Sequence, residues 1–147
     1  MDSKAIADAI AARFSGVTAN GESLMLVTAS LPNTISRGPV LLVYPPTGTT
    51  HLGTSRRRED VMEFPVRVLR DPLDVPARTD MLYAWYTAIR DRVEMNYDLD
   101  LAYVAWAGVE GDFRLELDGI TYAGGVFDVI EITVRVRLDE VVTTVAA

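Results

Sequence analysis

The sequence predicts an α+β fold: a mostly antiparallel β-sheet with two α-helices packed on one face and a long β-hairpin loop. The stretch from Val126 to Leu138 alternates between an apolar set of positions and a mixed or charged set, as a half-buried strand does. Two other stretches carry apolar residues at helical spacing. The predicted elements follow the order helix, strands, long loop, strand, helix, strands, which is typical of an α+β domain.

The stretch from Val126 to Leu138 is the strand around which we expect the rest of the chain to be organised. Ile, Val and Thr supply most of its positions and suit a pleated, half-buried surface. At about 3.4 Å per residue it would run roughly 40 Å, well beyond the usual strand of five or six residues. A strand of this length needs partners along its whole length. We therefore interpret it as the central strand of the sheet, extended past the body of its own subunit.

Two helices are predicted, the first from about Lys4 to Phe14 and the second from about Ala77 to Val93. In each helix the apolar residues fall on one face. The first helix is too short to be stable alone, so it must dock on the sheet. Together with two alternating strands, the helices predict a core that comprises Ile6, Ile10, Phe14, Met62, Phe64, Val66, Leu82, Trp85, Ile89, Ile130, Ile132, Val134 and Val136.

Strands are also predicted in the first half of the chain, at Leu24 to Ser30, Val40 to Tyr44 and Val61 to Leu69. Pro65 removes one hydrogen-bond donor from the last of these. We therefore expect the stretch from Val61 to Leu69 to be an edge strand, or a strand that carries a bulge.

Two further strands are predicted in the second half, at Leu101 to Ala107 and Phe113 to Leu117. The dipeptide Asp118-Gly119 is typical of a tight turn. The pair Gly124-Gly125 directly precedes the long strand and indicates a bulge or bend.

The stretch from Thr47 to Asp60 is rich in Gly, Thr and charge, and we expect it to be a mobile loop at the tip of a hairpin. Gly48 and Gly53 have the spacing of a phosphate-binding loop, but Thr54 replaces the lysine that would reach the phosphates. The stretch also leads into a strand, whereas phosphate binding needs a helix N-terminus. A flexible loop is therefore the better interpretation. His51, the only histidine, is expected to be an exposed loop residue.

Arg56, Arg57 and Arg58 form the only basic cluster of the chain. They are either part of a solvated loop or a contact with an acidic partner surface. Residues 71–147 carry 15 acidic and 6 basic side chains, so another copy of the same protein could supply that surface.

The composition excludes several classes of protein. The chain has 147 residues, of which 49% are hydrophobic, enough for a single domain with a real core. It lacks an apolar run approaching the roughly 20 residues that cross a bilayer, so we expect no membrane association. It has no cysteine, which excludes disulfides, thiolate metal sites and cysteine nucleophiles. A net charge of −7 is unfavourable for wrapping nucleic acid. We expect no cofactor and no enzymatic activity.

The layout resembles the tail terminator proteins of long-tailed bacteriophages, the lambda-like and related head–tail joining families. The resemblance covers nearly the whole chain and lies in layout rather than in a single motif. Four passages carry it: the helix KAIADAIAARF, the strand, polar loop and strand from Val40 to Leu69, the helix in DPLD…ARTDMLYAWYTAIRDRV, and the closing GITYAGGVFDVIEITVRVRL.

The resemblance implies a structural virion protein at the tail–neck junction, made in the host cytoplasm and without catalytic residues. Such a protein would form a hexameric ring on the completed tail tube, end tube polymerisation and present a joining surface to the head. The implied partners are other copies of the chain, the tail tube protein and a head–tail connector or neck protein. Genome DNA would pass through without sequence-specific binding.

The residues expected to bind partners are charged or ionisable side chains of the polar loop and of the long strand: His51, Arg56, Arg57, Arg58, Glu131, Arg135 and Arg137. Two alternative functions stay open. The protein could be another head–tail connector or tail-completion protein, or, more distantly, a small ligand-binding domain or enzyme that uses residues 47–55.

Overall fold

The computed structural model describes residues 3–35, 38–52, 57–72, 78–94, 99, 101, 104–109 and 111–141, with the backbone alone for residues 49–52, 57–59, 94 and 139–141. The first elements are α1 (Ser3–Arg13), β1 (Thr18–Ala19), β2 (Glu22–Ser23), β3 (Leu26–Thr28), β4 (Val40–Val43), β5 (Thr47–Leu52) and β6 (Arg57–Arg70). The remaining elements are α2 (Arg78–Glu94), β7 (Val104–Val109), β8 (Arg114–Tyr122) and β9 (Gly125–Val141). Both helices begin and end within one residue of their predicted bounds.

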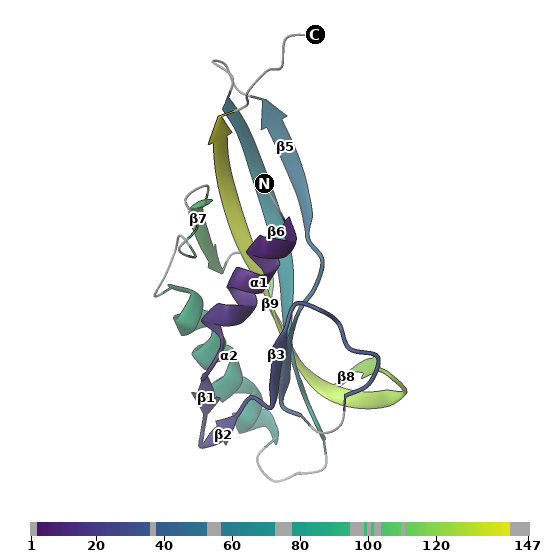
Figure 1. The fold of residues 1–147 in the computed structure, drawn as a ribbon. Coiled ribbons are helices and arrows are strands. Elements are labelled where there is room, and N and C mark those ends of the chain that lie inside the picture. The colour runs from purple at the N-terminus through teal and green to yellow at the C-terminus, as the bar shows by residue number, and fades with distance from the viewer. Residues whose placement is uncertain are drawn as a thin grey trace.

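Seven strands form one sheet in the order β3-β4-β6-β9-β7, with β5 beside β6 and β8 beside β9 (Figure 1). All neighbouring strands in this sheet are antiparallel except β3 and β4. β6 and β9 pair without interruption, from Arg57 opposite Val141 to Arg70 opposite Asp128. The prediction that the long strand lies at the centre of a mostly antiparallel sheet is therefore confirmed.

The expectation that Pro65 marks an edge strand is wrong, because β6 has neighbours on both sides. The backbone N–H of Tyr44 donates to the carbonyl oxygen of Pro65 at 2.8 Å. In an antiparallel pair the N–H and C=O of one residue point to the same side, so the proline nitrogen also faces this side. There the neighbouring chain is bulged, since Tyr44, Pro45 and Pro46 face only two residues of β6. The missing donor therefore falls at a break in the pairing.

The predicted loop from Thr47 to Asp60 is also wrong. Thr47–Leu52 form β5, which pairs with β6 from Thr47 opposite Glu63 to Leu52 opposite Arg58. Thr is a good strand former, and Thr47 and Gly48 at the start of β5 are exposed. Polarity alone therefore did not distinguish a loop from an edge strand. Residues 53–56, between the two strands, lie outside the described residues.

The β8–β9 hairpin turns at Ala123-Gly124 and not at Asp118-Gly119. Ala123 and Gly124 have φ angles of 49° and 84°, as both central residues of a type I′ turn do. Asp118, with a φ of 51°, lies inside β8, where the register against β9 shifts. The Asp-Gly pair therefore forms a bulge.

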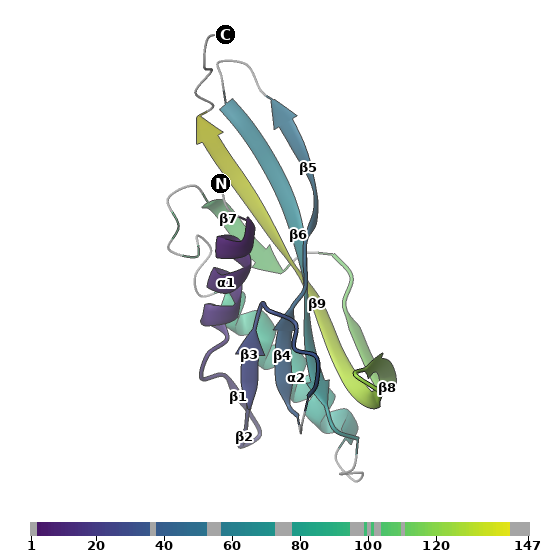
Figure 2. The same cartoon turned by 45° about the vertical axis from the view of Figure 1, so that its right-hand side comes forward.

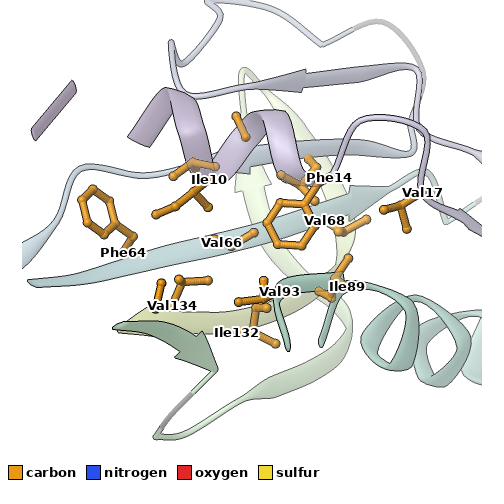
Figure 3. Close-up of a cluster of buried hydrophobic side chains, with 14 of the residues drawn as sticks. Ile10, Phe14, Val17, Phe64, Val66, Val68, Ile89, Val93, Ile132 and Val134 are labelled. Atoms are coloured by element: carbon orange, nitrogen blue, oxygen red, sulfur yellow. The ribbon is translucent and has the colours of Figure 1, made fainter. Parts of the chain in front are cut away.

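Both helices pack on one face of the sheet, as predicted (Figure 2). Figure 3 shows side chains of α1, α2, β6 and β9 directed toward one another in the layer between helices and sheet. Every predicted core residue is buried except Met62, which is half-buried against the same cluster. The other face carries a smaller buried cluster, formed by Val40, Leu42, Leu69 and Phe127.

The helices do not cover the whole sheet. We call the four-stranded part formed by β5, residues 57–63 of β6, residues 134–141 of β9 and β7 the arm. Its far end, where β5, β6 and β9 run together, extends beyond both helices (Figures 1 and 2).

Replacing Ile132 with alanine should lower the free energy of unfolding by about 2–5 kcal/mol, because Ile132 is fully buried between β9 and the helices. Urea denaturation measures this change. The control is Thr121→Ala on the exposed side of β8, which should change stability by about 0.5 kcal/mol or less. Equal losses in the two variants would contradict the assigned core.

Candidate assembly surface

Three of the four predicted partner-binding residues of the polar stretch fall on the hairpin of the arm. His51 belongs to β5 and lies opposite Glu59, while Arg57 and Arg58 begin β6. Arg56 lies outside the described residues, as do the side chains of His51, Arg57 and Arg58. The backbone therefore places His51, Arg57 and Arg58 on paired strands instead of on a loop.

Arg135 and Arg137 of β9 alternate with the buried Val136, so their side chains point away from the helices. Glu63 lies directly opposite Arg135, and Val61 lies opposite Arg137. We call this side of the arm the bare face. It is formed by Thr47, Val61, Glu63, Trp106, Arg135 and Arg137.

Glu131, the remaining predicted contact, already has partners inside the molecule. It accepts a short hydrogen bond from Nε of Arg67, and Nη2 of Arg114 lies 3.7 Å from the same carboxylate. The Arg67 guanidinium also lies 4.1 Å from the centre of the Tyr44 ring. Burial alone would lower the pKa of Arg67, but its hydrogen bonds to Glu131 and Tyr44 raise it overall. Glu131 therefore holds β6, β8 and β9 together within the subunit through Arg67 and Arg114.

A shallow groove of about 400 Å³ lies on the bare face beside β5. Its lining consists of Thr47, Gly48, Val61, Glu63 and Arg135. A Cβ atom at Gly48 would lie 2.5 Å from the carbonyl oxygen of Val61, so only glycine fits there. The groove therefore combines a small-residue wall with one acidic and one basic side chain.

β5 and β7 form the two edges of the arm, and no described strand pairs with the outer side of either. The strand order β5-β6-β9-β7 is antiparallel throughout, so β5 and β7 run in opposite directions. The Pro65 carbonyl faces the β5 side, and by alternation Glu63 and Val61 do so too. Gly48 and Thr50 of β5 must then direct their backbone N–H and C=O groups outward. Such an edge is a template for pairing with another chain.

Asp128, whose structural role the sequence analysis missed, is fully buried on the helix side of β9. Arg78, at the start of α2, donates to its Oδ1 from Nη2 at 2.6 Å and to its Oδ2 from Nε at 3.0 Å. The backbone N–H of Asp118 donates to Oδ1 at 2.8 Å. Burial alone would raise the pKa of Asp128, but these donors and the charges of Arg78 and Arg70 lower it overall.

Arg70 lies opposite Asp128 and extends the network to the β1–β2 hairpin. Its Nε donates to Oε1 of Glu22 at 3.0 Å, and Nε1 of Trp85 donates to the same oxygen at 2.8 Å. The network therefore ties β2, β6, β9 and α2 together at the end of the sheet opposite the arm tip. The sequence holds one sign of this network, because Asp128 occupies a position in the otherwise apolar set of alternating residues of the long strand.

Three observations bear on metal binding, membrane crossing and phosphate binding in the part of the chain that the structure describes. Within those residues, no group of three or more His, Cys, Asp or Glu side chains could hold a metal ion. No described helix is long and apolar enough to cross a membrane. The stretch with phosphate-loop spacing starts as strand β5, so Gly48 does not precede a helix. No protein-family model matches the chain, and no curated protein matches its sequence.

Replacing Asp128 with asparagine should destabilise the fold by about 3 kcal/mol at pH 7, because it leaves Arg78 without its buried counter-charge. The lowered pKa of Asp128 sets the pH dependence. Its contribution to stability is complete above the ordinary pKa of about 3.9 and is lost as the pH falls through the lower pKa of the folded state.

Urea denaturation between pH 7 and pH 2 measures this dependence. The variant should lose less stability on acidification than the wild type does. Asp8→Asn is the control, since the Asp8 side chain is exposed on α1. A variant with the stability and acid sensitivity of the wild type would contradict the role of Asp128.

Proposed function

We propose that this protein is a structural component of a bacteriophage virion that caps the end of the tail tube as a ring. It ends polymerisation of the tube and provides the joining surface for the neck of the head. The observation that carries the proposal is the pair of open edges on the arm, β5 and β7, which run in opposite directions across one sheet. The resemblance in layout to tail terminators supplies the assembly in which such a ring acts.

The two edges fit a ring because they differ from each other. If β5 of one copy lies beside β7 of the next, the antiparallel alternation continues from copy to copy. Such an interface is heterologous, and heterologous interfaces form rings when the rotation closes. The resemblance implies six copies, and the outward groups of Gly48 and Thr50 would join the neighbour.

The position of the helices and the pattern of charges on the sheet support a ring whose bare face points toward the central channel. α1 and α2 project from the opposite face and find more room on the outside of a closed sheet. On the inward face Glu63 lies opposite Arg135, and Arg67 pairs with Glu131. Alternating charges offer a phosphate backbone no continuous basic strip. Genome DNA would therefore pass through the ring without being held.

The tip of the arm is the proposed contact with the rest of the tail. Arg57 and Arg58 of the basic cluster lie where β6 begins, at the end of the arm that extends beyond the helices (Figure 2). Arginines form charge-assisted hydrogen bonds with carboxylates. The partner would be an acidic surface of the tail tube protein, the neck protein or a neighbouring copy.

A connector or tail-completion protein is the nearest alternative, and the phenotype separates it from a terminator. Loss of a terminator gives tails of abnormal length, whereas loss of a connector gives tails of normal length without heads. A ligand-binding domain is the more distant alternative. A rise in melting temperature with ATP or GTP would favour it, since a ligand that prefers the folded state stabilises that state.

Thr50→Pro should prevent ring formation while leaving the fold intact. The Thr50 N–H points away from β6, so proline removes a donor to the neighbour and none to the subunit's own sheet. Native mass measurement and a melting curve report the two properties. Thr50→Val, which keeps the N–H, is the matched control. A proline variant that assembles like the wild type would contradict pairing through β5.

Replacing Arg56, Arg57 and Arg58 with serine should weaken tail capping without changing the melting temperature, because none belongs to the predicted core. The residual binding should depend less on salt, since fewer charges remain to be screened. The measurement is complementation of a phage that lacks the protein, scored by tail length and head attachment. The matched triple lysine variant keeps the charge. Normal tails from the serine variant would rule out the arm tip as the docking element.

A further inference from the structure

We propose that Trp106 of one copy inserts into the groove on the bare face of the next copy. The groove is the one lined by Thr47, Gly48, Val61, Glu63 and Arg135. This inference rests on the proposed ring, because it names the side chain that locks the two strand edges together. It adds an anchor and a receptor to an interface otherwise made by backbone hydrogen bonds.

Trp106 is placed as an anchor at the edge of the arm. It lies on β7 opposite Arg137, and its side chain is on the bare face. The indole ring lies across Gly108, where an added Cβ would come within 2.6 Å of it. Trp106 is 38% exposed, although no described strand lies beyond β7. An aromatic side chain that is fixed in position but partly exposed to solvent is typical of the residues that dominate protein interfaces.

The groove is placed as the receptor at the opposite edge. It lies beside β5 on the same face as Trp106. The register connects the two sites in one row, because Thr49, Val61, Arg137 and Trp106 lie opposite one another across the four strands. Anchor and receptor are therefore at the same level on the two edges that would meet.

A second copy brings Trp106 to the β5 side of the groove. Within one chain β6 and β9 separate β5 from β7, so three strand spacings of about 4.8 Å put Trp106 roughly 14 Å from Thr47 and Gly48. The β9 side of the groove is nearer, because Arg135 lies opposite Gly108, which the indole ring covers. When β5 of one copy lies beside β7 of another, the β5 side of the groove becomes the neighbour of Trp106.

The first test measures the dissociation constant of the assembly by analytical ultracentrifugation. Trp106→Ala should raise it about 30-fold or more, as expected for an aromatic anchor worth at least about 2 kcal/mol. Tyr83→Ala is the matched control, since Tyr83 is a 60% exposed aromatic on α2 away from the arm. This control should leave the dissociation constant unchanged.

The second test uses the two tryptophans of the chain. Trp85 is completely buried, so acrylamide quenches mainly Trp106 in the free subunit. Assembly of the wild type should protect this fluorescence. Filling the groove with Thr47→Trp should block assembly, while Thr121→Trp, at another exposed strand position on β8, should not.

The outcomes separate this inference from the ring itself. An assembly that Thr50→Pro abolishes but Trp106→Ala leaves unchanged would overturn the anchor and keep the ring. Equal acrylamide quenching of Trp106 in the free and the assembled protein would also overturn the role of Trp106 as an anchor and leave the ring in place. A wild type that stays monomeric at every concentration would overturn both proposals.

Discussion

The uninterrupted pairing of β6 with β9 is the constraint on which the rest of the structure depends. The ladder runs from Arg57 opposite Val141 to Arg70 opposite Asp128. At about 3.3 Å per residue the 14 residues of β6 span about 46 Å, whereas the 17 residues of α2 span about 25 Å. The helices therefore cover one part of the ladder and leave the far end of the arm uncovered. A single chain of this size cannot bury both faces and both edges of so long a sheet.

The two ends of the ladder use charge differently. At the end near α2, Asp128 and Arg70 are buried and form ion pairs with Arg78 and Glu22. A register slip of one residue would move Asp128 to the other face, away from Arg78, so this network also disfavours the wrong register. At the arm, Glu63 and Arg135 lie on an exposed face, where ion pairs contribute little to stability.

Periodicity predicted the parts of the fold that bury apolar surface. It placed both helices within one residue, the long central strand and the core, because burial imposes a spacing on the sequence. It failed at β5, where the residues from Thr47 to Leu52 form an edge strand whose partner β6 lies further along the chain. It also misjudged Pro65, because the bulge that accommodates the proline belongs to the neighbouring strand.

The candidate site was predictable in part for the same reason. Arg135 and Arg137 follow from alternation along β9, which fixes the face they share. The groove and Trp106 do not follow, because they depend on the register that aligns β5, β6, β9 and β7. The turn was predicted at Asp118-Gly119 and a bulge or bend at Gly124-Gly125, whereas the chain turns at Ala123-Gly124 and bulges at Asp118-Gly119, because Asp118 and Ala123 both adopt positive φ. Only the pairing of β8 with β9 decides which one turns the chain.

The edges of the sheet are protected unequally, and this difference bears on assembly. β3 has only three residues, and Pro45 and Pro46 interrupt the edge between β4 and β5. Short strands, prolines and bulges are the means by which proteins prevent unwanted strand pairing. β5 has six residues without lysine, proline or a register shift against β6. An edge left open beside a protected one is therefore consistent with a strand that is kept for a partner.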